Sequence, residues 1–597
     1  MSEICSIDSV YLEDSLSDFN CSYTDGEEFV EKVNSLGCSF HLSKDELFDE
    51  LMAFATNMKK SELDLAFLDN FQQYFLKKST KIESSTNKRR TVLSEFRPSH
   101  SYQVKEDEAM DMTQSFVLPS VDGYEVPEYI KKFIPVESCA GSGWFMARTE
   151  PGKIMAKYIG KEATNGDILP RNEGKEKVSV VPLHGRYLGT GPPSYGNDKA
   201  AVVVNGLTSR LESYATAVRE SNATVFGDSP FVSLHQHSED EVLICGMVHM
   251  EVDCGRVEDA SIFILIADEE DGPVSVKVDA SSLEERCFFP GQMVVLRGVN
   301  KTGRLFEVNR QFEVDEKRGG GGEWGEVKRQ KDDATVWVAC GPFTPPSTAS
   351  FEPLAELIEQ TLKEKPSTLI LVGPFVDRKN SFMTSRGCKM SDADMTKLIV
   401  ERITSQLEGS STRVYMIPST SRDAAIVPCF PGGRLCIEGG QWSFGKDKTM
   451  ELLTDPCIIS VGGIEIAVTA SEIVAHLSSS ECFTSSNKEN TDRMARLAGH
   501  VVRQSSLYPL HPPSLSVSLE RLHESCTLQH RPHLIVAPCV LAPFIKNTNG
   551  VIVANPGPLC RGSSAGTILK IHFSLSSLPQ EGTKDMRQFT MAHIVRI

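Results

Sequence analysis

Residues 334–344 read ATVWVACGPFT, and residues 367–380 read STLILVGPFVDRKN. Each stretch begins with a short apolar run and ends at Gly-Pro, which is typical of a strand buried on both faces. Between them, apolar side chains recur at helical spacing at Leu354, Leu357, Ile358 and Leu362. The order strand, helix, strand predicts a βαβ unit with parallel strands.

The same alternation continues toward the C-terminus. A helix with Met395, Ile399 and Ile403 precedes RVYMIPS at 413–419, and CIISVGGIEIAVTA at 457–470 predicts a hairpin with a Gly-Gly turn. After a helix at 493–502 come four late strands: HLIVAPC at 533–539, GVIVANPG at 550–557, GTILKIHF at 566–573 and AHIVRI at 592–597. We therefore expect residues 334–597 to form an α/β sandwich with mixed sheets.

Length and composition indicate a multidomain globular protein. The chain has 597 residues, too many for one core, with 40% hydrophobic and 24% charged residues. No apolar stretch reaches the roughly 18 residues of a membrane span. The acidic start MSEICSIDSVYLED has neither the basic nor the apolar region of a secretory signal. We expect a protein of the cytosol or nucleus that does not cross a membrane.

Charge and cysteine content narrow the possible partners. The formal net charge of −18 provides no general positive field for phosphates, so contact with nucleic acid should be local or supplied by a partner. The 16 cysteines include no Cys-x-x-Cys pair. A zinc ribbon or a thioredoxin-like site is therefore disfavoured, and reduced thiols are expected.

Residues 1–80 predict a small helical bundle. Phe29, Val33 and their neighbours form one apolar face, and Ser43 to Glu46 reads as a capping box that begins a second helix. A third helix carries Leu63, Phe67, Phe71 and Phe75.

Residues 81–200 are predicted as a tether followed by a poorly assigned region. The part up to residue 116 is polar and has no hydrophobic period. Lys88-Arg89-Arg90 within it could assist nuclear import, although a solvated charge cluster is the favoured reading. Residues 117–197 are mixed in character and contain a strand-like run at 177–183.

Residues 201–316 predict an OB-type β-barrel. Apolar residues alternate from Val242 to Val252 and from Val274 to Val278, FPGQMVVLRGV at 289–299 adds a turn and a strand, and an amphipathic segment at 207–218 precedes them. Strand-binding barrels need stacking aromatics in a basic groove, whereas ADEEDG at 267–272 is acidic. Protein binding is therefore favoured. The GGGG at 319–322 marks residues 317–333 as a flexible joint without the Gly-Lys-Ser/Thr of a phosphate loop.

The expected carboxyl ends of the strands in 334–597 should gather at one edge, where ligands bind in such folds. They are Cys340-Gly341-Pro342, Gly373 to Asp377, Pro418 to Asp423, Ala537 to Val540, and Asn555-Pro556-Gly557. This series resembles the calcineurin-like metallophosphoesterases, whose strand ends carry Asp-x-His, Gly-Asp-x-x-Asp, Gly-Asn-His-Asp/Glu, a lone His, and Gly-His-x-His followed by Asn-Pro-Gly. Gly373, Asp377, Asn555 and Gly557 stand where that pattern expects them.

The metal ligands of that pattern are missing. Two divalent ions need a bridging carboxylate with further oxygen or imidazole donors, but Pro374 occupies the bridging position. Cys340 to Pro342, Ser419 to Arg422 and Ala537 to Val540 replace the other motifs, and Arg422 would repel cations. His476 is the one imidazole that could align, and a lone helical His is usually structural. We therefore expect no catalytic residue, no metal site and no cofactor.

A barrel followed by a phosphoesterase-like domain without ligands resembles the B subunits of the eukaryotic replicative DNA polymerases. Among them, FPGQMVVLRGVNKTGR at 289–304, VACGPFT at 338–344, LVGPFVDRKN at 371–380, YPLHPP at 508–513, NPGPLCRGSSAGT at 555–567 and the final VRI resemble the B-subunit family of DNA polymerase alpha–primase. The likeness is loose over 1–80 and close over 200–597.

This resemblance implies a non-catalytic accessory subunit in the nucleus. In that family the barrel and the phosphoesterase-like domain grip the C-terminal zinc module of the polymerase catalytic subunit, primase joins through the complex, and the N-terminal bundle recruits other replication proteins. Contact with DNA would be mainly indirect, which agrees with the acidic composition.

Three alternatives remain open from the sequence. An active metal-dependent phosphoesterase or nuclease could use only His235, His237, His530 and His533, which bring no carboxylate at ligand spacing. The accessory component of another replicative polymerase would share the domain order. A single-strand binder acting through the barrel is disfavoured by charge.

Overall fold

The computed structural model describes most of the chain beyond residue 144. The described residues are 145–163, 180–184, 196, 198–249, 262–269, 272–314, 325–385, 388, 390–435, 437, 443–445, 449–485, 492–583 and 585–597, with scattered positions between Ser22 and Phe71. Two compact units divide the chain, Met1–Gln114 and Ser115–Ile597. Within the described residues, no helix is both long and apolar enough to cross a bilayer.

The first unit contains a short parallel pair of strands, β1 (Ser22–Tyr23) and β2 (Glu62–Leu63). The predicted apolar residues Phe29, Val33, Phe67 and Phe71 are buried helical positions. Leu63 is also buried, but it lies in β2, so its assignment to the third helix was wrong. The capping box at Ser43 lies outside the described residues, and the helical bundle stays a prediction.

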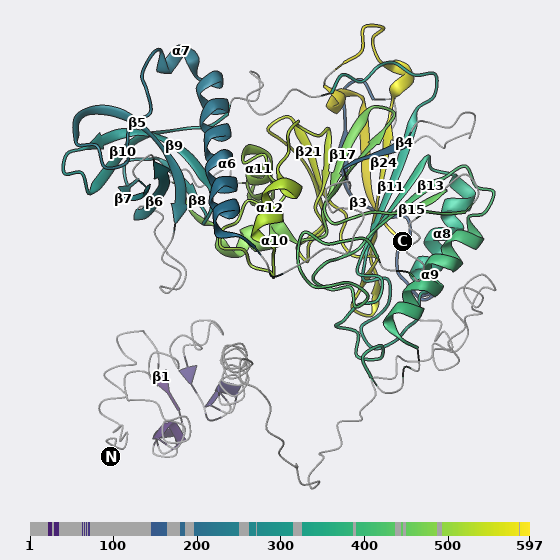
Figure 1. The fold of residues 1–597 in the computed structure, drawn as a ribbon. Helices are drawn as coiled ribbons and strands as arrows, with labels where there is room; N and C mark the ends of the chain where they lie inside the picture. Colours follow the sequence, from purple (N-terminus) through teal and green to yellow (C-terminus); the bar gives the residue numbers. More distant parts are fainter. Residues whose placement is uncertain are drawn as a thin grey trace. The chain divides into compact units, whose positions relative to one another are not determined.

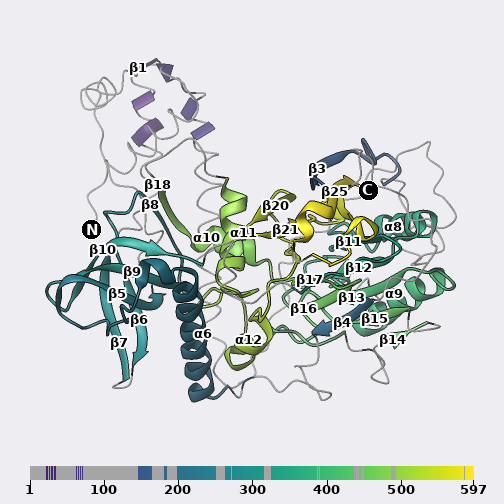
Figure 2. The same cartoon turned by 90° about the horizontal axis from the view of Figure 1, so that it is seen from above.

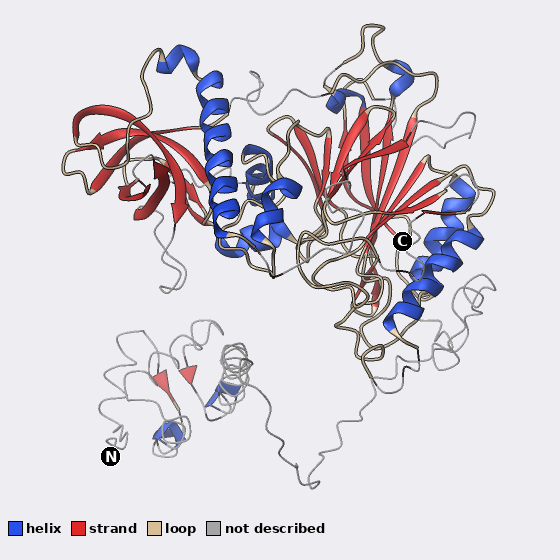
Figure 3. Cartoon of the chain, viewed as in Figure 1, coloured by secondary structure: helices blue, strands red, loops and turns tan. Residues whose placement is uncertain are grey.

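The second unit contains a closed five-stranded barrel, as the sequence predicted. Its strand order is β10-β7-β6-β5-β9, and the strands are drawn in red in Figure 3. Alternate strand residues, such as Val276 with Val278 and Leu296 with Val294, form the apolar core inside the barrel. The bounds are β5 (Ser238–His249), β6 (Ile262–Glu269), β7 (Gly272–Asp279), β9 (Met293–Asn300) and β10 (Leu305–Phe312).

A 22-residue helix, α6 (Ala200–Ser221), lies against the barrel (Figure 1). Its buried residues Tyr214 and Val218 pack on Leu243, Val295 and Phe312, which confirms the amphipathic segment. The short helix α7 (Ala223–Phe226) follows it.

The rest of the second unit is built on two mixed sheets. The eight-stranded sheet has the order β14-β15-β13-β12-β11-β24-β25-β3, with β11 (Ala334–Cys340), β12 (Thr368–Val372), β13 (Arg413–Ile417) and β15 (Met450–Leu452) parallel. Its remaining strands are β14 (Ser443–Phe444), β24 (Thr567–Phe573), β25 (Thr590–Arg596) and β3 (Ile154–Ile159).

The six-stranded sheet has the order β20-β21-β19-β17-β16-β4. Its strands are β4 (Val180–His184), β16 (Cys457–Val461), β17 (Ile464–Val468), β19 (Leu534–Val536), β20 (Phe544–Thr548) and β21 (Val551–Asn555). The predicted Gly-Gly hairpin is the β16–β17 pair, whose turn places Gly462 and Gly463 at positive φ.

Three buried clusters show how the layers pack. Alternate residues of β11 and β12 contact α8 (Glu352–Glu364) and α9 (Asp392–Gln406) on one face, and the second sheet on the other face. The outer face of the second sheet packs on α10 (Ile473–Ser480) and α11 (Arg493–Arg503). The domain is thus layered helix, sheet, sheet, helix, and the predicted α/β sandwich with mixed sheets is confirmed.

Small elements complete the domain. They are α12 (Leu519–Cys526), the hairpin of β22 (Cys560–Arg561) and β23 (Ser564–Ala565), and the 3-10 helices η3 (Leu575–Ser577) and η4 (Met586–Phe589). In addition, β8 (Glu285–Phe288), which follows the third barrel strand, pairs with β18 (Cys482–Ser485) of the α/β domain (Figure 2).

Residues before the barrel also belong to the α/β domain. β3 pairs with β25 at the edge of one sheet, and β4 pairs with β16 at the edge of the other. Phe145 is buried against α8, where its N–H donates to Glu352. The region that the sequence left unassigned therefore supplies an edge strand to each sheet.

The joint at 317–333 is anchored over its second half. Val327 is fully buried and forms a two-bond bridge with Thr583, and Gln330 donates to Gly462 O. The expectation of a flexible joint was wrong for residues 325–333, because these contacts fix the backbone.

Candidate functional site

The strand ends that the sequence singled out do meet. The N–H of Gly341 donates to Val372 O, and the N–H of Gly373 donates to Ile417 O, so the ends of β11, β12 and β13 lie side by side. The loop after β19 joins them, since Cys539 lies close enough to Cys340 to affect its titration. The question is what their polar side chains contact.

Asp423, in the loop after β13, holds three backbone groups. Its carboxylate accepts from the N–H groups of Phe375, Val376 (3.1 Å) and Ser419 (2.7 Å). A side chain at Gly373 would collide with this carboxylate. Burial raises the pKa of Asp423 to about 7 against the effect of the three donors. Asp423 thus fastens the loops after β12 and β13 to each other.

Asp377 stands where the phosphoesterase pattern expects a carboxylate, but this carboxylate is paired with the guanidinium of Arg422. The guanidinium of Arg422, which is half-buried, forms an ion pair with the buried Asp377 through two nitrogens, and Arg422 also lies 3.7 Å from Glu472. The Arg that the sequence placed in the pocket therefore neutralises the carboxylate of Asp377.

Asn555 and Gly557 also stand where the pattern expects them, and their contacts are internal. Asn555 Oδ1 accepts from the N–H of Cys539 (3.1 Å) and of Gly557 (3.0 Å), and Nδ2 donates to Cys539 Sγ (3.1 Å) and Leu541 O (3.2 Å). The Asn555 side chain is fully buried. It holds together the loops after β19 and β21.

Asp455 is a buried carboxylate that the sequence reasoning missed. It accepts from the hydroxyls of Thr420 (2.9 Å) and Thr469 (3.1 Å) and from the N–H of Ala470 (2.9 Å). Burial raises the pKa of Asp455 to about 6. The available signal was its position just after the short strand β15, as Asp423 follows β13.

The candidate histidines do not form one site. The hydroxyl of Tyr508 accepts from Ser514 N–H and lies 3.1 Å from His476 Nδ1, within hydrogen-bond distance. On the barrel side of the second unit His235 and His237 are exposed, and His530 is exposed in the α/β domain.

His533 is buried. Its Nδ1 accepts from Glu465 N–H (3.0 Å), and its Nε2 faces Gly325 O (3.2 Å). Burial lowers the pKa of His533 to about 4, so the ring is neutral near pH 7. The positions of these four histidines do not favour the alternative of an active phosphoesterase.

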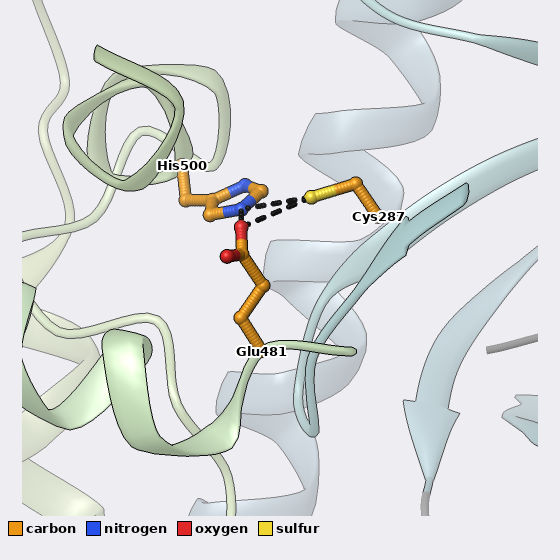
Figure 4. Close-up of side chains that lie close together, drawn as sticks. All are labelled: Cys287, Glu481 and His500. Carbon is orange, nitrogen blue, oxygen red and sulfur yellow. Dashed lines mark hydrogen bonds and ion pairs between the residues drawn. The ribbon is translucent and has the colours of Figure 1, made fainter. Parts of the chain in front are cut away.

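A different cluster of ligand-type side chains lies where the barrel region meets the α/β domain. Cys287 of β8, Glu481 at the end of α10 and His500 of α11 converge in Figure 4, with ligand atoms within 4.8 Å of one another. Nothing in the sequence pointed to this set, because its members come from three elements with no local spacing.

Both oxygens of the Glu481 carboxylate accept hydrogen bonds. It accepts from Arg496 Nε (2.9 Å) and Nη2 (3.0 Å), from His500 Nε2 (2.8 Å) and from Cys287 Sγ (3.1 Å). Burial opposes its charge, but the bonds from His500 and Arg496 lower the pKa of Glu481 to about 2. The carboxylate is therefore ionised.

The protonation pattern of this cluster follows from a second arginine. Arg503 Nη2 lies 3.1 Å from His500 Nδ1, and a guanidinium can only donate. Nδ1 must then accept, and the ring proton lies on Nε2 and points at Glu481. A metal ion would have to remove that proton and the Cys287 proton and displace Arg496. The geometry favours a hydrogen-bonded junction between barrel and α/β domain.

Comparison with known proteins covers both units. The family model for the N-terminal region of the DNA polymerase alpha B subunit matches residues 11–78. The model for the OB domain of the same B subunit matches 204–314, the barrel, and the model for the B subunit of DNA polymerases alpha and epsilon matches 336–546.

Two similar proteins match over nearly their whole length, and a third matches over about two thirds of its length. The DNA polymerase alpha B subunit of Caenorhabditis elegans is 28% identical over 96% of this chain and 97% of its own. That of Mus musculus is 24% identical over 98% of this chain and 99% of its own, and that of Schizosaccharomyces pombe is 24% identical over 64% and 67%. With all three family models in the expected order, the chain belongs to the family of DNA polymerase alpha B subunits.

Proposed function

We propose that this chain is a non-catalytic accessory subunit of a DNA polymerase alpha–primase complex, acting in the nucleus at the start of DNA replication. Family membership over nearly full length supports the subunit assignment. The α/β part would be a calcineurin-like phosphoesterase domain that has lost its chemistry. The contacts made by side chains at the strand ends support this second part of the proposal.

The decisive observation is what Asp377 and Asn555 contact. These two residues keep the positions of phosphoesterase ligands, yet Asp377 pairs with Arg422 and Asn555 bonds backbone groups of neighbouring loops. Pro374, which stands at the bridging position, offers no side-chain donor. A pair of divalent ions needs a shared carboxylate and open coordination positions. The polar groups here are already used to hold loops together, which favours a scaffold.

We infer further that the barrel and the α/β domain present one surface to the catalytic subunit of the polymerase, at its C-terminal zinc module. The strand pair β8–β18 and the buried Glu481 cluster join the two domains and would keep that surface in one geometry. Primase would join through the complex, the N-terminal unit would recruit further replication proteins, and DNA would be contacted mainly through partners.

Two measurements test this proposal. The tagged full chain, purified from nuclear extract, should bring down the polymerase catalytic subunit and primase at matched stoichiometry. The same preparation should hold no pair of Mn, Fe or Zn ions by elemental analysis. About two such ions per chain, together with phosphodiester hydrolysis that is lost on changing Asp377, would establish the active phosphoesterase instead.

A further inference from the structure

The helix α6, which precedes the barrel, lies beside α12 of the α/β domain (Figure 1). A small cavity is lined by residues of both helices. Its volume is about 30 Å³, which is room for one or two water-sized occupants. Its polar lining includes Arg210 of α6, Tyr508, His511, and His523 of α12. The cavity lies apart from the strand ends and from the Glu481 cluster.

Arg210 is a half-buried cation whose charge no carboxylate among the described residues balances. Its hydrogen bond from Nη2 to Pro509 O is long, at 3.5 Å, and its Nε is shielded from solvent with no acceptor in the described part of the chain. No carboxylate among the described residues forms an ion pair with it. Burial lowers the pKa of Arg210 to about 10, which still leaves the guanidinium charged at pH 7. A charge that is partly removed from water and has an N–H group shielded from solvent without an acceptor is unfavourable.

The other groups around the cavity supply no negative charge. Burial raises the pKa of Cys526 well above its ordinary value, so its sulfur is a neutral thiol, and burial raises the pKa of Tyr508 to about 12. Burial and the charge of Arg210 lower the pKa of His511 and of His523. Glu524, whose charge acts on His523, is exposed. His249 adds a further imidazole beside His511.

We propose that this cavity binds one small inorganic anion of about the size of chloride, held by the Arg210 guanidinium with His511 and His523 as neighbouring donors. The small volume excludes larger anions, because the four oxygens of a phosphate need more room than two water-sized positions. The anion would neutralise the Arg210 guanidinium, which is the only charge of this lining that no other described residue balances. It would also tie α6 to the segment around α12, so that it strengthens the attachment of the barrel.

The approach of the two helices supports a bridging role. A Cβ atom at Gly206 would lie 3.3 Å from the His523 ring, so α6 already packs tightly on α12 one turn from Arg210. Asp198 adds a second tie at the start of α6, where its carboxylate accepts from Ser518 Oγ (2.7 Å) and Leu519 N–H (2.9 Å). An anion at Arg210 would extend this contact along the helix.

The test is thermal unfolding of the full chain in sodium chloride and in sodium gluconate of equal ionic strength, since gluconate is too large for the cavity. The wild-type melting temperature should be higher in chloride, by about 2 °C if chloride is present at several times its Kd. Arg210→Met keeps an unbranched apolar side chain at this position and removes the guanidinium charge. This variant should show the same melting temperature in both salts.

Arg304→Met, at an exposed position of the barrel, is the matched control and should keep the full chloride effect. A crystal soaked in sodium bromide should show one anomalous peak beside the Arg210 guanidinium. Equal wild-type melting temperatures in both salts, or an equal chloride effect in Arg210→Met, would overturn the proposal. So would a cavity that holds only water in the bromide soak.

Discussion

Arg422 forms a partly buried ion pair with Asp377 across the loops that follow β13 and β12. The pair turns the one carboxylate in a phosphoesterase ligand position toward a guanidinium. Asp423, the next residue, binds the N–H groups of Phe375 and Val376 in the same loop. Two adjacent residues therefore hold the loop after β12 in place, and substitutions in this loop should affect stability before they affect any chemistry.

Restoring the bridging carboxylate should not restore a metal site. Pro374 is buried, and Pro374→Asp would place a second carboxylate close to Asp423 while Arg422 is already paired. We expect a loss of about 1–3 kcal/mol in the free energy of unfolding, with no phosphodiesterase activity. Thermal melts with and without Mn²⁺ measure both effects.

Val540→Asp is the control for that experiment, because Val540 is 64% exposed in the loop after β19. It should leave the melting temperature nearly unchanged. Stabilisation of Pro374→Asp by several degrees in Mn²⁺ would show that the loops still form a metal-binding cavity.

Asp423 should make stability depend on pH. Its pKa is raised to about 7 in the folded chain, above the ordinary value near 4 of an unfolded chain, so between those values the folded state binds the extra proton. The free energy of unfolding should therefore fall as pH rises from about 5 to 7, and level off above. Asp455, with its pKa raised to about 6, adds to the same trend at lower pH.

Chemical denaturation at pH 6 and pH 8 checks this sign. Asp423→Asn, which cannot titrate, should reduce the difference between the two pH values even though it also lowers stability by turning an amide N–H toward Ser419 N–H. An undiminished difference in the variant would assign the pH dependence to other groups.

The central strands were predictable because burial on both faces leaves a continuous apolar run, as in TLILV of β12. The barrel was predictable because apolar residues alternate with other residues along its strands. β3 was not, because an edge strand has one free side and its partner β25 lies over 400 residues away in the sequence. The departure of the strand ends from the phosphoesterase pattern could be read in the sequence, but the partners of Asp377 and Asn555 could not. Loop contacts depend on tertiary geometry and leave no periodic signal.

The Glu481 cluster should hold the barrel to the α/β domain. Glu481→Gln replaces one acceptor oxygen with a donor that faces Arg496 or His500, so we expect a loss of about 2–4 kcal/mol. Hydrogen exchange should show β8 and β18 opening more often than the barrel core. Glu285→Gln, exposed on the same strand β8, is the matched control and should have little effect.

Chelation separates the hydrogen-bonded cluster from a metal site. Because Arg503 fixes the His500 proton on Nε2, a strong chelator should leave the melting temperature of the wild-type chain unchanged. A fall of several degrees on chelation, absent from Cys287→Ser, would show that the cluster binds a metal ion.

The last prediction concerns where the chain can be shortened. Residues 1–80 should be dispensable for folding of the second unit and for its binding to the polymerase catalytic subunit, and the division after Gln114 extends that expectation to a chain that begins at Ser115. A chain that begins at Asn165 should behave differently, because it lacks Phe145, which is buried against α8, and β3, which pairs with β25. Loss of β3 would also remove its half-buried residues Ala156 and Tyr158, which pack on the core between the sheets. We therefore expect the chain from 115 to melt and to bind the catalytic subunit like the full chain, and the chain from 165 to melt several degrees lower and to aggregate through the bared edge of the eight-stranded sheet. Melting and pull-down of the two truncated chains side by side provide the measurement. Equal melting temperatures of the two chains would show that residues 145–163 do not stabilise the domain. Failure of the chain from 115 to bind the catalytic subunit would show that the main interface lies in the first unit.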